Sequence, residues 1–452
     1  MKRQQPLHVI LNVTHRCNLA CRYCYYSKEM ATKPGHMSLE VVERVFESIS
    51  RSSATAVDFS IHGGEPLLHT PSYFRDLFTL QRQYLRGRVT QNSIQTNGTL
   101  LDETFIAAYE AIVGADTHLG LGLSLDGPQA VHDGSRRYRK TGGGSFHDVM
   151  RGLDLLHRHG IQVAILAVAP LPWPDCGRDL YQFFKALPNV HLVDLLVPSG
   201  DSFPDAPEGS LTKMYTELFD AWFFDGNASF EVRFFCSIIQ ALLTGSGTLC
   251  TFQEDCVINN IMLSIVPDGD TSFCDSFTEV KLGNIWTHSV DELAARNHPE
   301  RMRFSVVERR RIEACLFCKW FNVCHGGCPA AHMPGSRSPH HFCSEYQRIF
   351  SHVDARLREI DIAASHGLGE ENLTRLVNPR LSDHLRKLRY GREHGGHQGG
   401  DTAGGTGVMK QAAPVLKSQS AVGSLSRKDR PATTLPAAQP AAGKQHIGDF
   451  QP

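Results

Sequence analysis

Short runs rich in aliphatic and β-branched residues alternate with helical segments along the first half of the chain, and this alternation limits the folds that it can adopt. The runs are Leu7–Val13, Ala56–Ile61, Thr90–Thr96, His118–Ser124, Ile161–Val168 and Val190–Val197. The segments with the periodicity or length of a helix are 38–50, 71–86, 102–112, 145–159 and 176–187. Repetition of strand, helix and strand predicts a parallel sheet with right-handed crossovers. Six strands are too few for a closed eight-stranded barrel.

The composition indicates a globular protein with almost no net charge. The chain has 452 residues, of which 41% are hydrophobic, and this length suggests about two to three domains. A net charge of -1 disfavours a nucleic acid or an anionic membrane as a partner. The apolar run after Lys2 and Arg3 is short and contains His8 and Asn12, unlike a signal peptide or a membrane span. We therefore expect a cytoplasmic protein, in which the 13 cysteines are metal ligands or catalytic groups rather than disulfides.

Three cysteines lie within eight residues just after the first β-rich run. Cys17, Cys21 and Cys24 have the spacing CxxxCxxC. Three thiolates on one loop can bind three corners of an iron–sulfur cube. The fourth iron is then open, and an open coordination position is what distinguishes a catalytic metal site from a structural one. The alternative is three core or zinc-binding cysteines, because a short cysteine motif needs support from its context.

Further polar motifs follow the next strands. Gly63, Gly64 and Glu65 come after the second run, and paired glycines let the backbone approach a ligand closely. Ser124 ends the fourth run and Arg136 follows it; an arginine can bind a carboxylate with two parallel hydrogen bonds. The simpler interpretations are a glycine turn, a polar turn and a solvated charge. Because chemistry in parallel α/β folds lies at the C-terminal ends of the strands, we expect these residues near the cysteines.

The second half of the chain contains a second set of cysteines. Its members are Cys250, Cys256, Cys274, Cys315, Cys318, Cys324, Cys328 and Cys343. Eight thiolates suffice for two four-cysteine clusters, although Cys-x2-Cys pairs also suit a structural zinc domain. Gly269 lies in a Pro-Asp-Gly-Asp segment that predicts a hairpin turn. The two remaining cysteines, Cys176 and Cys236, are predicted to pack as small hydrophobic residues.

Together these motifs resemble the radical SAM superfamily, whose hallmark is CxxxCxxC with an aromatic residue before the last cysteine. The resemblance implies an α/β fold with a partial (β/α)6 barrel. It implies a [4Fe–4S] cluster on Cys17, Cys21 and Cys24, whose open iron binds S-adenosylmethionine. Reductive cleavage of S-adenosylmethionine then yields a 5′-deoxyadenosyl radical that removes hydrogen from the substrate. The residues that the resemblance assigns to cofactor binding are Tyr23, Gly63, Gly64, Glu65, Ser124 and Arg136.

From Leu7 to about Tyr346, the order and spacing of the motifs resemble the anaerobic sulfatase-maturating enzymes and related ribosomal-peptide maturases. The second set of cysteines matches their SPASM domain, which carries two auxiliary [4Fe–4S] clusters. The implied ligands are Cys250, Cys256, Cys274 and Cys328 for one cluster and Cys315, Cys318, Cys324 and Cys343 for the other. Asp275 matches an aspartate that takes the substrate proton in sulfatase maturases, and the simpler interpretation is an aspartate that caps a turn.

The resemblance implies an enzyme that modifies a peptide or protein substrate. We expect maturation of a ribosomally made peptide, by a cross-link or an oxidation, and the alternative is conversion of a sulfatase Cys or Ser to formylglycine, which Asp275 supports. An electron donor such as flavodoxin or ferredoxin would reduce the clusters. Two further alternatives are a non-catalytic electron carrier and a zinc-bound interaction module. A pure electron carrier, however, needs no cofactor pocket.

The sequence predicts four regions in the chain. They are the partial barrel at 1–205, a bridging helical segment at 206–245, the SPASM domain at 246–366, and a C-terminal extension at 367–452 that is largely disordered after 390. Apolar residues at helical spacing predict a helix at Ser210–Phe224 in the bridging segment. Ser145 with Asp148 predicts a variant capping box, and Gly160 marks the end of that helix.

Overall fold

The structure, a computed structural model, describes residues 6–26, 35–115, 117–169, 176–197, 207–331 and 341–365, together with Asn378 and Leu381. The chain divides into two units, residues 1–396 and 397–452, and everything described lies in the first. The predicted C-terminal extension at 367–452 is therefore outside the described residues, apart from Asn378 and Leu381.

The six predicted strands form a parallel sheet in chain order, which confirms the α/β fold class. They are β1 (Leu7–Thr14), β2 (Val57–Gly63), β3 (Val89–Thr96), β4 (Gly120–Ser124), β5 (Val163–Val168) and β6 (Val190–Leu196). A seventh strand that the sequence did not predict, β7 (Glu231–Val232), pairs in parallel with β6. The region predicted to be a helical bridge thus also adds a strand to the barrel sheet.

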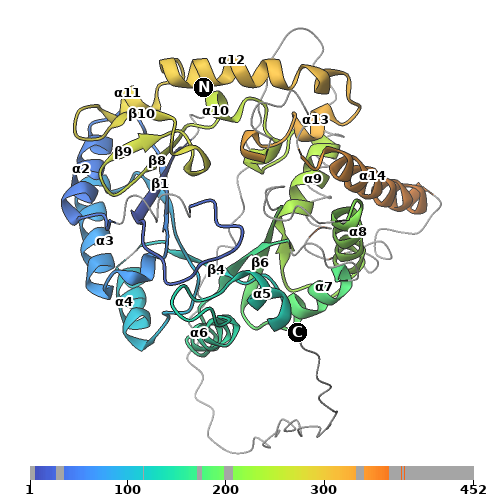
Figure 1. Cartoon of the computed structure of the whole chain (residues 1–452), viewed down its shortest axis with the longest axis horizontal. Helices are drawn as coiled ribbons and strands as arrows, with labels where there is room; N and C mark the ends of the chain where they lie inside the picture. The colour runs from blue at the N-terminus through green and yellow to red at the C-terminus, as the bar shows by residue number, and fades with distance from the viewer. Residues whose placement is uncertain are drawn as a thin grey trace, which may run out of the picture. The chain divides into compact units, whose positions relative to one another are not determined.

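The helices that connect these strands lie along the outer side of the sheet (Figure 1). They are α2 (Leu39–Ser50), α3 (Pro71–Leu85), α4 (Glu103–Val113), α5 (Gln129–Ser135), α6 (Phe146–Arg158) and α7 (Gly177–Ala186). Ser38 and Asp102 cap α2 and α4 through side-chain oxygens that accept backbone N–H groups. Gly160 follows α6 with φ of 67°, as predicted. The predicted capping role of Ser145 is wrong, because its side chain makes no capping hydrogen bond.

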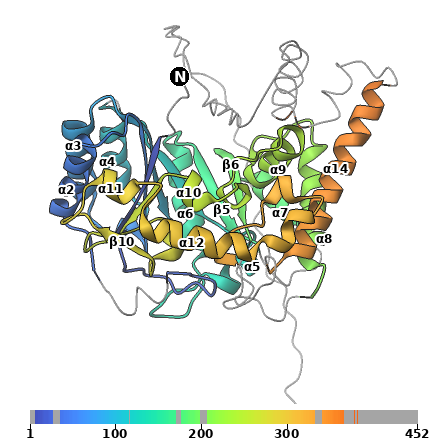
Figure 2. The ribbon, with the colours of Figure 1, turned by 90° about the horizontal axis from the view of Figure 1, so that it is seen from above.

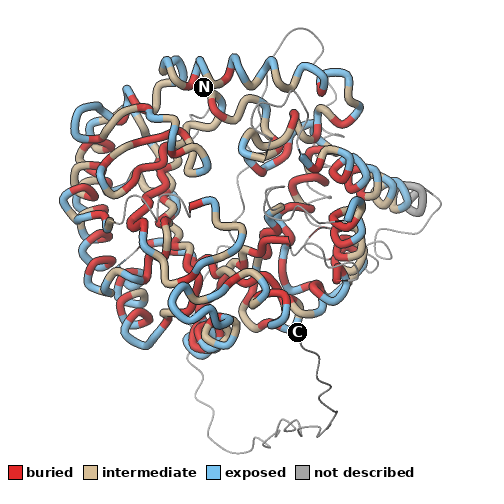
Figure 3. The backbone as a smooth tube through the Cα atoms, viewed as in Figure 1, coloured by how far each residue is buried: buried red, intermediate tan, exposed pale blue. Residues whose placement is uncertain are grey.

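The two faces of the sheet differ in polarity. In β1, Val9, Leu11 and Val13 are buried on the helix side, where buried residues are concentrated (Figure 3). On the opposite face, polar side chains bond across neighbouring strands. These bonds are His8–Ser60, Ser60–Ser93, Gln95–Ser124 and Asn12–Ser264. A strand covered by helices on both faces is a continuous apolar run. The alternation seen here therefore leaves a polar inner face, suited to a polar ligand.

The second half of the chain continues the same sheet. Strand β8 (Met262–Ile265) pairs in parallel with β1, and β9 (Asp270–Ser272) and β10 (Lys281–Asn284) follow in antiparallel order. Gly269, with φ of 86°, lies in the turn between β8 and β9, which confirms the predicted hairpin. The pairing of β8 with β1 brings the second set of cysteines to the side of the sheet where the chain begins.

The remaining helices surround this extension. They are α8 (Ser210–Phe223), α9 (Arg233–Thr244), α10 (Cys256–Asn259), α11 (Val290–Ala294), α12 (Pro299–Arg311), α13 (Phe321–Cys324) and α14 (Cys343–Ser365). Helix α14 lies beside α8 (Figure 2), where Asp220 pairs with His352 and Arg356. Cys176 is buried in the core and Cys236 packs against it, as predicted. Among the described residues, no helix has the length and hydropathy needed to cross a membrane.

Candidate active site

The loop with the first three cysteines leaves the C-terminal end of β1 and is held by backbone hydrogen bonds to a distant segment. Ala20 N donates to Arg137 O at 2.8 Å, and Arg22 N donates to Ser135 O at 3.0 Å. Asn97 Nδ2, from the end of β3, lies 3.8 Å from Cys17 Sγ. The loop is therefore held by the end of α5 and the end of β3, and not shaped by its own sequence alone.

The three thiols of this loop lie close enough to influence one another. Burial, helped by the charges of neighbouring cysteines such as Cys24, raises the pKa of Cys17 to about 12 and that of Cys21 to about 11. Deprotonating such a group is costly unless a cation binds the thiolates and releases their protons. This donor set fits an iron–sulfur cluster.

The paired glycines at the end of β2 let the chain pass very close to the cysteine loop. A Cβ atom on Gly64 would lie 2.1 Å from Arg16 O, and one on Gly63 would lie 2.4 Å from Thr14 O. In their place, Gly64 N donates to Thr14 O at 2.7 Å and Glu65 N donates to Arg16 O at 2.8 Å. These close approaches to the protein's own backbone fix the start of the cysteine loop, and the predicted approach to a ligand stays a prediction.

The carboxylate of Glu65 is completely buried. It accepts hydrogen bonds from Leu67 N at 2.9 Å, Thr96 Oγ1 at 2.6 Å and Asn97 N at 2.7 Å. Burial raises its pKa, although these bonds oppose the rise. Glu65 therefore joins the ends of β2 and β3.

Ser124 ends β4 on the polar inner face, where its Oγ accepts a hydrogen bond of 3.1 Å from Gln95 Nε2.

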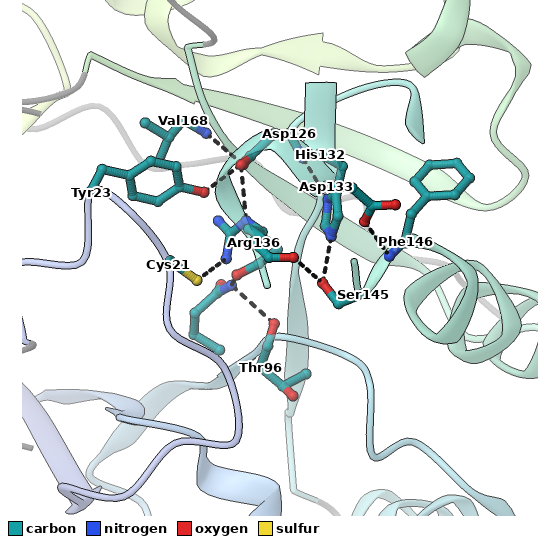
Figure 4. A network of polar contacts seen from close by, with 12 residues as sticks. Cys21, Tyr23, Thr96, Asp126, His132, Asp133, Arg136, Ser145, Phe146 and Val168 are labelled. Carbon is teal, nitrogen blue, oxygen red and sulfur yellow. Dashed lines mark hydrogen bonds and ion pairs between the residues drawn. The ribbon is translucent and has the colours of Figure 1, made fainter. Parts of the chain in front are cut away.

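Arg136 is buried against the cysteine loop and pairs with a carboxylate of its own chain (Figure 4). Its Nε lies 3.1 Å from Asp126 Oδ2, and its guanidinium lies over the Tyr23 ring at 5.3 Å. Tyr23 donates a hydrogen bond to the same Asp126 oxygen, and Nη1 of Arg136 lies 4.0 Å from Cys21 Sγ. Burial alone would lower the pKa of Arg136, but Asp126, Tyr23 and Cys21 raise it, so the guanidinium is a fixed positive charge beside the cysteines.

A neutral histidine holds this segment in place. His132 Nδ1 accepts from Asp126 N at 3.4 Å, so its Nε2–H donates to Ser145 Oγ at 3.0 Å. Ser145 Oγ in turn donates to Arg136 O at 2.9 Å. Burial lowers the pKa of His132 to about 4, which keeps the acceptor nitrogen unprotonated. Figure 4 shows the chain of contacts from Asp126 to Ser145.

The eight cysteines of the second set form two groups. In the first, which we call group I, Cys250, Cys256, Cys274 and Cys328 interact electrostatically, and burial raises the pKa of each. None of the cysteines, all of which lie in described residues, forms a disulfide bond.

The other four cysteines, which we call group II, surround a cavity of about 100 Å³. Cys315, Cys318, Cys324 and Cys343 line it together with apolar residues such as Trp320. Nowhere in the described part of the chain do three His, Cys, Asp or Glu side chains converge to hold a single metal ion. A [4Fe–4S] cluster poses a different requirement, because each thiolate binds its own iron. The cavity and its donors fit such a cluster.

Asp275 lies between the cysteine loop and group I. Tyr25, one residue after Cys24, donates a hydrogen bond of 2.7 Å to Asp275 Oδ2, and Cys274 Sγ lies 3.5 Å from Asp275 Oδ1. The Asp275 carboxylate opposes the fall in pKa that burial imposes on His8 and His62, two residues of the polar inner face. Asp275 is therefore a negative charge within reach of the face where a substrate would lie.

Sequence reasoning missed the residues that complete these contacts. Asp126 lies in the turn after β4, and its role depends on a partner, Arg136, that follows a separate helix. Tyr25 contacts a carboxylate 250 residues away. Asp194 on β6 forms an ion pair with Arg233, with 3.1 Å between Oδ2 and Nη1. Arg233 directly follows β7, a strand that the sequence did not predict. Only Asp126 had a sequence signal, as a polar residue at a strand end.

Comparison with known proteins places this geometry in a family. Residues 11–184 match the model of the radical SAM superfamily. The chain is 30% identical over 384 residues to a serine-type anaerobic sulfatase-maturating enzyme of Bacteroides thetaiotaomicron, covering 77% of this chain and 90% of that one. It is 27% identical over 372 residues to a cysteine-type enzyme of Clostridium perfringens, covering 78% and 97%.

A solved structure agrees with these relatives. This structure is native anSMEcpe with bound AdoMet and the Cp18Cys peptide. The two structures superpose with a TM-score of 0.65 at 25% sequence identity, and the match covers 79% of this chain and 99% of that one. The chain therefore belongs to the radical SAM superfamily, alongside the anaerobic sulfatase-maturating enzymes, and is a peptide- or protein-modifying enzyme that uses S-adenosylmethionine and iron–sulfur clusters.

Proposed function

We propose that the chain oxidises a Cys or Ser side chain of a protein substrate to formylglycine, as an anaerobic sulfatase-maturating enzyme. The observation that carries this proposal is the position of Asp275, joined to Tyr25 by a hydrogen bond of 2.7 Å and adjacent to group I. The similarity to both serine-type and cysteine-type maturases supports it. Maturation of a ribosomally made peptide, which the sequence favoured, is the alternative.

The proposal assigns cofactor sites to named residues. Cys17, Cys21 and Cys24 hold the cluster that binds S-adenosylmethionine, and group I and group II hold the two auxiliary clusters. Tyr23, Gly63, Gly64, Glu65, Ser124 and Arg136 shape or contact the S-adenosylmethionine site. Among these, Glu65, Tyr23 and Arg136 act through the contacts described above, which fix the strand ends and the cysteine loop.

The chemistry divides between the cofactors and the protein. When bound, S-adenosylmethionine and the clusters supply removal of a hydrogen atom from the substrate Cβ and a place for the electron left behind. Asp275 takes the proton from the substrate hydroxyl or thiol, and a carbon–oxygen or carbon–sulfur double bond forms as the O–H or S–H and C–H bonds break. With Ser the product is the aldehyde. With Cys, water then replaces the sulfur, which leaves as hydrogen sulfide.

Tyr25 and the inner face of the sheet position the reacting groups. The Tyr25 hydroxyl orients Asp275, because its hydrogen bond occupies one carboxylate oxygen. His62 and His8 lie on the same face, and burial lowers the pKa of both, which favours the neutral imidazole. Neutral imidazoles there carry no positive charge that would compete with the substrate hydroxyl or thiol for the Asp275 carboxylate.

The test uses anaerobically reconstituted full-length protein with dithionite and S-adenosylmethionine. Synthetic peptides that copy a sulfatase modification site, with Cys, Ser or Ala at the target position, are analysed by mass spectrometry. The proposal expects aldehyde on the Cys or Ser peptide and none on the Ala peptide. If both remain unmodified while a ribosomal precursor peptide encoded near this chain is cross-linked or oxidised, the alternative is correct.

The proposal also includes features that lie around the site. A small electron carrier such as flavodoxin or ferredoxin would reduce the first cluster in a reducing cytoplasm. The barrel at 1–205, the bridge at 206–245 and the SPASM domain at 246–366 would act as one body, because β7 pairs with β6 and β8 pairs with β1.

A further inference from the structure

One largely buried arginine interacts with cysteines of both auxiliary groups. Arg311 is the last residue of α12, and only 12% of its side chain is exposed. Its Nε donates to Glu308 Oε2 at 2.9 Å, and the two residues also form an ion pair. Its Nη1 is buried and has no hydrogen-bond acceptor among the described residues. A buried N–H without an acceptor is costly, so a missing group is indicated.

The charges nearest to Arg311 are cysteines from both groups. Its guanidinium interacts electrostatically with Cys328 of group I and with Cys315 of group II. In turn, the charge of Arg311 opposes the rise in the pKa of Cys315 that burial causes. Burial lowers the pKa of Arg311 to about 10, so it remains a cation at neutral pH. Arg309 and Arg310, its neighbours on α12, are exposed.

We propose that Arg311 donates a hydrogen bond to cluster sulfur and raises the reduction potentials of both auxiliary clusters. The inference rests on the proposed assignment of groups I and II as cluster ligands. It makes Arg311 a positioning and tuning residue, because it acts through the clusters and does not touch the substrate.

The physical reason is charge. Reduction adds one electron to a centre that already carries four thiolates, and a nearby cation stabilises that added charge. Hydrogen bonds to the sulfurs and the charge around a cluster are among the factors that set its potential. The effect is large at Arg311 because the side chain is shielded from water, where charges interact more strongly. An exposed arginine is screened by solvent and salt.

The role fits the proposed reaction. Oxidation of the substrate leaves an electron that an auxiliary cluster must accept, and a higher potential makes the cluster a better acceptor. Because Arg311 interacts with both groups, it would keep the two potentials close and allow the electron to pass between them. Losing the cation would make both clusters poorer acceptors.

The test measures potentials in a background where Cys17, Cys21 and Cys24 are replaced by alanine, so that only auxiliary clusters remain. Arg311→Met, Arg311→Lys and the matched control Arg310→Met are made in this background. Each is titrated with a reductant under anaerobic conditions, and the reduced clusters are followed by electron paramagnetic resonance. The proposal expects Arg311→Met to shift the midpoint potentials of both clusters to more negative values. Arg311→Lys should shift them less, and Arg310→Met should leave them unchanged.

Unchanged potentials in Arg311→Met with a full iron content would overturn the inference. If Arg311→Met loses iron, Arg311→Gln is measured instead, because it keeps an N–H donor and lacks the charge. It should also shift both potentials to more negative values, and unchanged potentials there would overturn the inference. A background protein that binds no auxiliary clusters would contradict the assignment of groups I and II instead. The two failures are therefore distinguishable by iron analysis.

Discussion

The Tyr25 hydroxyl donates a hydrogen bond of 2.7 Å to Asp275, a residue 250 positions later in the chain. Tyr25 belongs to the loop of Cys24, and Asp275 follows Cys274 of group I. The contact therefore joins the proposed site of the first cluster to the proposed site of an auxiliary cluster. It is possible because β8 pairs with β1 and carries the cysteine-rich region to the start of the sheet.

Replacing Tyr25 with Phe should slow turnover of the peptide without preventing S-adenosylmethionine cleavage. Removing a hydrogen bond to a charged group costs roughly 1.5 to 3 kcal/mol, so we expect kcat to fall at least about tenfold with little change in KM. Tyr84→Phe is the matched control, because Tyr84 donates a similar bond of 2.7 Å to Glu43, away from the site. Equal kinetics for both variants would contradict the orienting role of Tyr25.

Gly64→Ala should prevent assembly of the first cluster. A Cβ atom there would lie 2.1 Å from Arg16 O, so the backbone at the start of the cysteine loop must move. Gly134→Ala is the control, because a Cβ there meets nothing within 4 Å. We expect the Gly64 variant to lose about a third of the bound iron and all cleavage of S-adenosylmethionine, if three similar clusters are present. Retention of full iron and cleavage would show that the close approach is not required.

Asp126→Asn should destabilise the protein strongly. It removes the charge partner of Arg136, and breaking a buried ion pair costs roughly 3 to 5 kcal/mol. The control is Asp154→Asn, which breaks an exposed pair with Arg158 that is worth about 1 kcal/mol or less. Thermal unfolding of the three proteins should show a large fall in melting temperature for Asp126→Asn alone. Similar falls for both variants would contradict the buried role of the pair.

Acid should destabilise the folded state through His132. The imidazole has a pKa of about 4 in the folded chain and 6.5 as its ordinary value, so the unfolded chain binds more protons between these values. Stability should fall as the pH drops from 6.5 to about 4, by a total of roughly 3 kcal/mol from this group.

His132→Gln tests this pH dependence because it cannot be protonated. The variant should lose less stability than wild type when melting temperatures at pH 7 and pH 5 are compared. In His159, contact with Glu110 raises the pKa, so His159→Gln should not reduce the loss in acid. If His132→Gln and wild type lose equal stability, a different group controls the acid sensitivity.

The sequence predicted the features that depend on local pattern. Alternating runs located the strands β1 to β6, and glycine at 160 and 269 marked a helix end and a hairpin, because each needs a positive φ. The spacing of cysteines, read through a family resemblance, grouped residues such as Cys256 and Cys328 that the fold does bring together.

Features that depend on long-range pairing could not be predicted in the same way. Strand β7 has two residues, too few to show a period, and β8 meets β1 only because the second half of the chain folds back. Ser145 fits a capping motif, but its hydroxyl is used between His132 and Arg136. A local motif cannot reveal such a competing partner.

The most direct test of the account compares wild type with Asp275→Asn while measuring two products, 5′-deoxyadenosine and peptide aldehyde. Wild type should form both in equal amounts. The variant should still form 5′-deoxyadenosine, because the first cluster is intact, but aldehyde should fall by two orders of magnitude or more, on the order of the 10²–10⁴-fold contribution of a general base. Aldehyde formation by Asp275→Asn at the wild-type rate would contradict the proposed function of this site.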